Sequence, residues 1–290
     1  MSSENFTGKT ALVLCGGGAP GAVEVGLYRA LVELGVQFDF VVGSSIGAVN
    51  GALIAAGLSP AEIEEHWRRL RTRDVLGPRW QAVRLLWGAP SVYDNHRLRA
   101  FLQETLPVPW FRQLRIPLYV VATDLKTGEA VVLDQGDLTE AILASTALPG
   151  LFPPMLWRGR QLVDGCLSDN VPIDVAVARG AGRVIGILCG CGQMPWRHPS
   201  LISILGQSFA LALQARFRSD LRFYKDRVDV QILDPCPGSG LPLLDFDRAW
   251  TLIEPAYEHA LKLLRQQTSE APEAETSPGS GARPLIGSRR

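Results

Sequence analysis

The chain has 290 residues, of which 47% are hydrophobic and 20% charged, so it is long enough for one large α/β domain or two small ones. Lysine plus arginine and aspartate plus glutamate each number 29. This balance excludes nucleic acid as the main partner, because binding to phosphate backbones requires an excess of basic residues.

The first residues, 1–9, are polar and contain no apolar segment of the kind that forms a signal peptide. The sequence also lacks a run of about 18 apolar residues that would predict a membrane span. We therefore expect a cytoplasmic protein whose five cysteines are reduced. Cys189 and Cys191 are the one closely spaced pair, and no cysteine or histidine pair follows at ligand spacing, so we expect no metal site there.

The chain begins with a predicted strand, a glycine-rich loop and a helix. The apolar run 10–15 is typical of a strand buried in a parallel sheet, and 22–34 has the spacing of an amphipathic helix. The loop between them, 16–21, formally fits the dinucleotide-binding pattern. That fold requires an acidic residue at the end of the second strand, whereas Asp39 stands at its start. The alternative is a cluster of backbone N–H donors that binds negative charge, as in an oxyanion hole.

The second predicted strand, 38–42, leads into Gly43-Ser44-Ser45-Ile46-Gly47 and then into a helix that ends near Gly57. A G-x-S-x-G sequence between a strand and a helix is typical of a nucleophile elbow, in which a sharp turn exposes the central serine, here Ser45. The pentapeptide alone is also common in ordinary loops. The loop 16–21 favours the nucleophile elbow over an ordinary loop. It follows an adjacent strand, so both loops would lie at the same edge of the sheet.

After a predicted helix at 60–73, the composition becomes basic. The segment 67–115 contains ten arginines and three acidic residues, and within it Trp80, Leu85, Leu86 and Trp87 form a short aromatic and apolar stretch. One interpretation is a helical insertion with a solvated arginine face. The other is a cap that meets anionic lipid headgroups at a membrane surface.

The remainder predicts an alternation of strands and helices. A hairpin is expected at 117–133, helices at 138–147, 172–179, 199–222 and 245–264, and strands at 183–188 and 228–233. From residue 267 the sequence is rich in Ser, Pro, Gly, Ala and Glu, which predicts a disordered tail over 267–290. We thus expect one domain over 10–266, folded as a three-layer α/β/α sandwich around a mostly parallel sheet.

A serine hydroxyl needs a base to act as a nucleophile. The usual hydrolase order along the chain is serine, acid, histidine, which leaves two candidates. They are His198, in a predicted loop, and His259, on a predicted helix face. Neither stands in a glycine-rich turn that would present it to a site. Asp164 does, because it ends a predicted strand and Gly165 follows at once.

Several motifs together resemble the patatin-like phospholipase family in order and spacing. They are Gly16-Gly17-Gly18 with Gly21, Gly43-Ser44-Ser45-Ile46-Gly47, the segments 122–128 and 145–154, Asp164-Gly165, and Asp169-Asn170-Val171-Pro172. The likeness covers the motif-bearing core, 12–188. It implies that Ser45 is the nucleophile and Asp164 its base, without a histidine. It also implies that Gly16, Gly17, Gly18, Ala19 and Gly21 form the oxyanion hole, with Gly43 and Gly47 flanking the elbow.

The chain departs from the family pattern at two places. Pro20 stands where the family usually has arginine or lysine, and Cys166 follows Asp164-Gly165 where it usually has glycine or alanine. The first removes a cation beside the oxyanion loop, and the second places a small thiol in the turn.

The resulting hypothesis is a serine acyl hydrolase of phospholipid or lysophospholipid esters that works through an acyl-serine intermediate and needs neither metal nor cofactor. Its partner is the lipid or acyl-ester substrate, with peripheral membrane contact through 67–115. The alternatives are an acyltransferase or thioesterase with the same dyad, and a non-catalytic lipid-binding regulatory protein.

Overall fold

The computed structural model describes residues 8–78, 85, 88–189, 201–234 and 241–269. Most of the predicted tail and of the aromatic stretch in the basic segment lies outside these residues, as does His198. The predicted domain limits, 10–266, stay a prediction. No helix in the described ranges is both long and apolar enough to cross a bilayer.

Within the ranges given above, eight strands form a single sheet at the centre of the fold. In spatial order they run β5-β6-β3-β2-β1-β7-β8, and β4 pairs with β3. Their bounds are Lys9–Leu14 (β1), Phe40–Ser44 (β2), Leu118–Asp124 (β3), Ala130–Leu133 (β4), Met155–Trp157 (β5), Arg160–Asp164 (β6), Ala181–Ile187 (β7) and Asp229–Leu233 (β8). The strands from β3 to β8 along this path are parallel, whereas β4, β5 and β6 join by antiparallel pairing.

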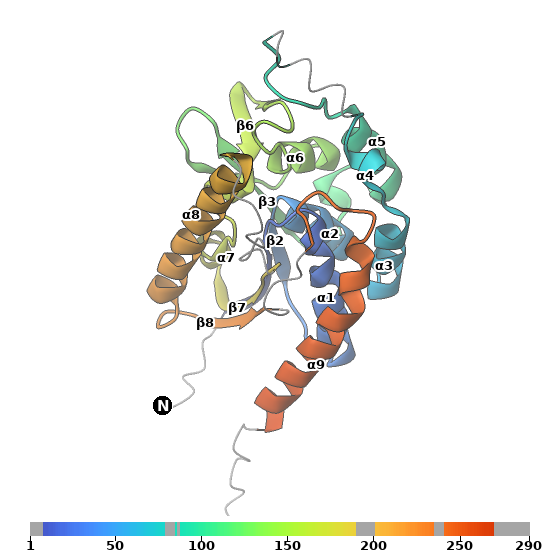
Figure 1. Ribbon diagram of the computed structural model, residues 1–290. Coiled ribbons are helices and arrows are strands. Elements are labelled where there is room, and N and C mark those ends of the chain that lie inside the picture. The colour runs from blue at the N-terminus through green and yellow to red at the C-terminus, as the bar shows by residue number, and fades with distance from the viewer. Residues whose placement is uncertain (1–7, 79–84, 86–87, 190–200, 235–240, 270–290) are drawn as a thin grey trace, which may run out of the picture.

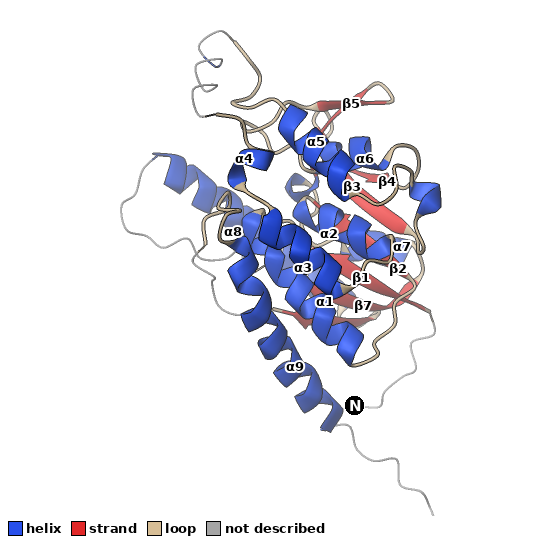
Figure 2. Ribbon diagram, turned by 90° about the vertical axis from the view of Figure 1, so that its right-hand side faces the viewer, coloured by secondary structure: helices blue, strands red, loops and turns tan. Residues whose placement is uncertain are grey.

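Helices cover both faces of the sheet. Their bounds are Val23–Glu33 (α1), Ile46–Ala55 (α2), Pro60–Arg69 (α3), Thr72–Val75 (α4), His96–Thr105 (α5), Leu138–Ser145 (α6), Ile173–Ala178 (α7), Leu201–Tyr224 (α8) and Ile253–Ser269 (α9). Helices α1, α2, α3 and α9 lie on one side of the sheet, and α7 and α8 lie on the other (Figures 1 and 2). The predicted three-layer α/β sandwich is thereby confirmed.

The predicted elements differ from the observed ones mainly between β2 and β3 and around β6. The helix expected at 60–73 ends at Arg69, because Leu70 has extended backbone angles, and α4 follows as a separate short helix. Helix α5 and strand β5 were not expected from the sequence. The short strand β5 pairs with β6 in a hairpin whose turn contains Arg158 and Gly159, both with positive φ.

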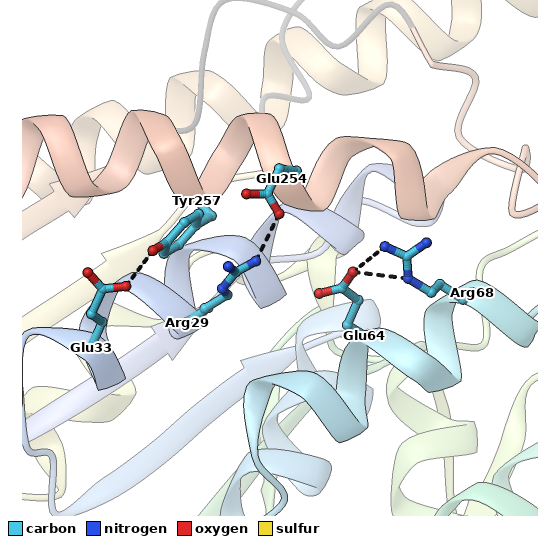
Figure 3. A network of polar contacts seen from close by, with 6 residues as sticks. All are labelled: Arg29, Glu33, Glu64, Arg68, Glu254 and Tyr257. Atoms are coloured by element: carbon cyan, nitrogen blue, oxygen red, sulfur yellow. Dashed lines mark hydrogen bonds and ion pairs between the residues drawn. The ribbon is translucent and has the colours of Figure 1, made fainter.

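Helix α9, far from the early motifs in sequence, packs along α1. Arg29 on α1 forms an ion pair with Glu254 at 2.8 Å and lies 3.9 Å from the centre of the Tyr257 ring, while the Tyr257 hydroxyl bonds to Glu33 (Figure 3). Each of these exposed contacts contributes little by itself. Gly26 on α1 allows the close approach, since a Cβ there would lie 2.2 Å from the carbonyl oxygen of Ile253.

The turn between β2 and α2 depends on two close backbone approaches. A Cβ at Gly43 would lie 2.4 Å from the carbonyl oxygen of Gly47, and a Cβ at Gly47 would lie 2.5 Å from that of Leu14. These partners are backbone atoms of α2 and β1, so they cannot move aside as a flexible side chain could. Glycine at both positions is therefore a steric requirement of the elbow.

We expect Gly47→Ala to lower the free energy of unfolding by about 1–3 kcal/mol, as other overpacked sites do. Gly51→Ala on the same helix is the matched control. Its Cβ would lie 3.1 Å from a methyl group of Val41, which can adjust, and alanine raises helix propensity by about 1 kcal/mol. Urea denaturation compares the two variants. A Gly47→Ala protein no less stable than Gly51→Ala would contradict the steric argument.

Candidate active site

Ser45 lies between β2 and α2 in a strained backbone conformation. Its φ is 54° and its ψ is −122°, a region that costs a non-glycine residue about 1–3 kcal/mol. Helix α2 begins at the next residue, so the positive end of its dipole lies beside Ser45. The Ser45 N–H donates to the Ser145 hydroxyl at 2.9 Å, and that hydroxyl donates to the Val121 carbonyl at 2.6 Å. Ser145 thus links the elbow to β3.

Strand register brings Asp164 to the same edge of the sheet. Ser44 at the end of β2 pairs with Val121, and the next residue of β3, Ala122, pairs with Asp164 at the end of β6. The Ser45 hydroxyl oxygen lies 2.7 Å from Oδ2 of Asp164 and donates to it. The structure therefore brings together the two residues predicted to form the dyad.

The environment of Asp164 makes it a stronger base than an ordinary aspartate. Its side chain is 2% exposed. Burial raises the pKa of Asp164 to about 6, although hydrogen bonds from the Cys166 N–H at 2.9 Å and from Ser45 oppose that rise. Gly165 permits the turn that follows, since a Cβ there would lie 2.1 Å from the Val121 carbonyl oxygen. The thiol side chain of Cys166 is accommodated as a buried group in this turn.

The residues of the glycine-rich loop differ in whether their N–H groups are already used. Gly16 donates to Asn170, Ala19 donates to the Leu243 carbonyl at 2.8 Å, and Gly21 donates to the Gly18 carbonyl at 2.9 Å. Within the described residues, no hydrogen bond of this kind is found for the N–H of Gly17 or Gly18. These two N–H groups are therefore the donors best placed to bind a ligand.

Asn170 and Leu243 hold this loop, and their roles were missed in the sequence. The Asn170 side-chain oxygen and its backbone carbonyl accept from the Gly16 N–H at 3.1 and 3.3 Å. A signal for Asn170 existed, because it stands in the Asp169-Asn170-Val171-Pro172 motif. Leu243 had none: a Cβ at Gly18 would lie 2.4 Å from its carbonyl oxygen, a contact between residues more than two hundred positions apart.

A buried polar network lies behind the loop. Asn50 on α2 donates to Oε2 of Glu24 at 2.7 Å and to the Gly21 carbonyl at 3.0 Å, and it accepts from the Trp67 indole N–H at 3.0 Å. Burial raises the pKa of Glu24 to about 8, so this acid is neutral at pH 7. Trp67, the first residue of the basic segment, is consequently a core residue rather than a surface anchor.

A cavity of about 1050 Å³ opens above the dyad. Ser45, Asp164 and Gly17 lie on its wall. Most of its remaining lining is apolar and comes from helices on both sides of the sheet, including Leu53, Leu98, Phe209 and Phe217. The volume and apolar lining suit a hydrocarbon chain with one polar group at the dyad.

The histidines do not complete a triad within the part of the chain that the structure describes. The hydrogen bonds found for Ser45 and Asp164 involve no histidine. His259 lies half-buried on α9. His66 lines the cavity, and burial together with Arg69 lowers its pKa below the usual value.

Comparison with known proteins agrees with the serine elbow, the glycine-rich loop and the α/β sandwich. A sequence model of the patatin-like phospholipase family matches residues 12–177. The chain belongs to the patatin-like phospholipase family.

Relatives are found in mammals and bacteria. Patatin-like phospholipase domain-containing protein 6 of Homo sapiens is 34% identical over 191 residues, which are 64% of this chain and 14% of that protein. An NTE family protein of Mycobacterium tuberculosis is 36% identical over 186 residues, 62% of this chain and 48% of that protein. The chain thus matches a small part of the mammalian relative and about half of the bacterial one.

Solved structures share the fold at low sequence identity. The crystal structure of VipD from Legionella pneumophila superposes with a TM-score of 0.51 and 16% identity, and the match covers 89% of this chain and 67% of that one. The likeness agrees with a mixed sheet flanked by helices.

Proposed function

We propose that this protein is a serine acyl hydrolase that cleaves carboxylic esters of phospholipids or lysophospholipids. The observation that carries the proposal is the 2.7 Å hydrogen bond from the Ser45 hydroxyl to Asp164 at the wall of a largely apolar cavity. Membership of the patatin-like phospholipase family supports a lipid ester as the substrate class.

The reaction begins when Asp164 takes the proton of the Ser45 hydroxyl as that oxygen attacks the ester carbonyl. The resulting tetrahedral oxyanion accepts hydrogen bonds from the N–H groups of Gly17 and Gly18, and the nearby helix dipole adds to this stabilisation. Asp164 then protonates the leaving alcohol, and an acyl group remains on Ser45. In the second half Asp164 takes a proton from water as the water oxygen attacks the acyl-enzyme. The bond to Ser45 then breaks, Asp164 returns the proton to the Ser45 oxygen, and the fatty acid is released.

The shared dyad also fits transfer of the acyl group to another alcohol or hydrolysis of a thioester. Product analysis separates these reactions, because transfer to an alcohol gives a new ester, whereas hydrolysis gives a carboxylic acid together with an alcohol from an ester or a thiol from a thioester. A lipid-binding protein without activity would give neither. The buried, hydrogen-bonded Asp164 supports an enzyme, since a carboxylate kept out of water costs stability without serving simple lipid binding.

We expect Ser45→Ala to abolish ester hydrolysis and labelling by a fluorophosphonate probe, because both need the nucleophilic oxygen. Ser44→Ala is the matched control. The Ser44 hydroxyl is buried and has no hydrogen-bond partner among the described residues, so its loss should leave most activity. The measurement is probe labelling with peptide mapping beside turnover of a soluble ester. Labelling of Ser44, or normal turnover by Ser45→Ala, would refute the assignment.

We expect Asp164→Asn to lower kcat by about 10²-fold or more, because asparagine keeps the size but cannot accept the proton. For the wild type, kcat/KM should rise with pH and level off with a midpoint near the Asp164 pKa of about 6, since the base works only when ionised. His259→Ala should show the same profile. A collapse of activity in His259→Ala with the fold intact would instead indicate a histidine base.

The basic segment 67–115 supports a further part of the proposal, namely that it contacts anionic membranes. Arg73 lies 3.9 Å from Asp74 but its side chain is 83% exposed, and Leu85, the described residue of the aromatic stretch, is 47% exposed. Other arginines are engaged within the fold: Arg68 pairs with Glu64 and Arg99 with Glu140. Each remaining cation near an anionic surface contributes about 1 kcal/mol, which salt screens.

We expect the protein to co-sediment with phosphatidylglycerol vesicles more than with phosphatidylcholine vesicles, and to lose this binding as salt rises. Leu85→Ser should reduce hydrolysis of vesicle lipid more than hydrolysis of a soluble ester, because the first requires docking. Leu156→Ser on β5 is the matched control, an exposed leucine (74%) outside the segment. Equal binding to both vesicles, or equal effects of the two variants, would refute membrane contact through this segment.

A further inference from the structure

Two cysteine thiols meet directly behind the active site. Cys15 follows β1 and Cys189 lies just after β7, the parallel neighbour of β1. Their sulfur atoms lie 2.9 Å apart, and the backbone N–H of Cys189 donates to the Cys15 sulfur at 3.0 Å. Each residue is 1% exposed, yet both line the cavity that contains Ser45. A small molecule in that cavity therefore lies next to the two cysteines.

The position of Cys15 couples this pair to the oxyanion loop. It directly precedes Gly16, where an added Cβ would lie 3.1 Å from the Cβ of Ser45, so the backbone of the loop passes close to the nucleophile. On the other side, the Cys189 sulfur donates to Oε1 of Glu24 at 3.3 Å. A change in the bonding of the two sulfurs can therefore shift the backbone at Gly16, which lies next to the nucleophile.

We propose that Cys15 and Cys189 form a redox-active dithiol site, which a hydroperoxide entering the cavity converts to a disulfide, and that this disulfide reversibly lowers the activity of the site. The second half rests on the function proposed above. The site uses residues of this chain that the family motifs do not contain: Cys15 precedes the glycine run, and Cys189 lies beyond the matched residues 12–177.

The sulfur separation favours a disulfide over a metal ion. Cys15, Glu24 and Cys189 place three donor atoms within 4.8 Å of one another, as a metal site would. Two thiolates on one tetrahedral zinc ion lie about 3.7 Å apart, given Zn–S bonds of about 2.3 Å. The observed 2.9 Å is well inside that spacing. Forming a bond of about 2.05 Å requires the sulfurs to approach by about a further 0.9 Å, from 2.9 Å.

The chemistry balances with one hydroperoxide per disulfide. The Cys15 sulfur accepts a hydrogen bond from the backbone N–H of Cys189, which stabilises its anionic, nucleophilic form, and the proton lost by the Cys15 thiol goes to the oxygen that leaves. The Cys15 sulfur attacks the terminal oxygen of the hydroperoxide, the O–O bond breaks, and an alcohol leaves, giving a sulfenic acid. The Cys189 sulfur then attacks the Cys15 sulfur, the S–O bond breaks, and hydroxide leaves as water with the Cys189 proton. Both sulfurs are oxidised and the peroxide is reduced.

The disulfide would draw Cys15 toward β7 and remove the thiol hydrogen that Cys189 gives to Glu24. Gly16 and the donors at Gly17 and Gly18 follow Cys15 directly, so the oxyanion hole moves relative to Ser45. A misplacement of about 1 Å in a catalytic site can cost about 100-fold in rate. We therefore expect a fall in activity of about 10-fold or more from this smaller shift.

The experiment treats the reduced, full-length protein with hydrogen peroxide in a buffer that contains a chelator. Remaining thiols are then blocked with N-ethylmaleimide, and non-reduced peptides are mapped by mass spectrometry while soluble-ester turnover is measured in parallel. We expect a linked peptide pair containing Cys15 and Cys189, a fall of about 10-fold or more in turnover, and recovery of both with dithiothreitol. Cys15→Ala and Cys189→Ala should each retain their own reduced activity after the same treatment.

Cys166→Ala and Cys191→Ala are the matched controls, and each should stay as sensitive to peroxide as the wild type. Cys189→Ala tests the same bond if Cys15→Ala does not fold. An active protein without the linked peptide, a linked peptide without loss of turnover, or undiminished sensitivity in Cys189→Ala would each overturn the dithiol proposal. If the reduced protein hydrolyses no ester, the proposed function is wrong. Regulation of that activity by the disulfide is then wrong as well, even where the linked peptide forms.

Discussion

The backbone of Ser45 is the constraint on which the rest of the site depends. A serine with φ of 54° stores strain, and the surrounding structure must hold it there. Helix α2 does so by packing its first turn against the end of β1, with Gly47 over the Leu14 carbonyl. Every residue of α2 is buried, so the helix cannot tilt to relieve the turn. The Ser145 hydroxyl then satisfies the Ser45 N–H that this geometry would otherwise leave without a partner.

Burial brings the pKa of Asp164 close to that of an ordinary histidine side chain. A carboxylate at its ordinary pKa of about 3.9 is a weak acceptor for a serine proton. Removal from water raises the pKa of Asp164 to about 6, and the carboxylate is still largely ionised at pH 7. Burial raises the pKa of Glu24 even more, to about 8, so Glu24 is mostly neutral at pH 7. At pH 7 Asp164 is therefore mostly ionised and Glu24 mostly neutral, so Glu24 adds little negative charge behind the glycine-rich loop.

The proximity of Ser45 and Asp164 could be predicted from the sequence because a local pattern marks each residue. A strand, a tight turn with obligatory glycines and a helix are contiguous around Ser45, and Asp164-Gly165 ends a short apolar run. Trp67 could not be placed in the same way. The two residues after it are arginines, which suggest a surface, but its position is decided by Asn50 and by Phe246, whose ring stacks on the Trp67 ring with 6.4 Å between the ring centres. Contacts at such separations leave no periodic pattern in the sequence.

The glycine-rich loop 16–21 also depends on contacts that the sequence pattern does not reveal. Its glycines and the dyad lie within residues 12–177, the part that matches the family. Leu243, which accepts from Ala19, and Phe246, which packs on Trp67, lie beyond it, as do Phe209 and Phe217 in the cavity wall. The residues that carry out the proposed chemistry are thus separate in sequence from many of those that shape the acyl site. In this chain, α8 and the residues before α9 therefore shape the cavity beside the elbow, its glycines and Asp164.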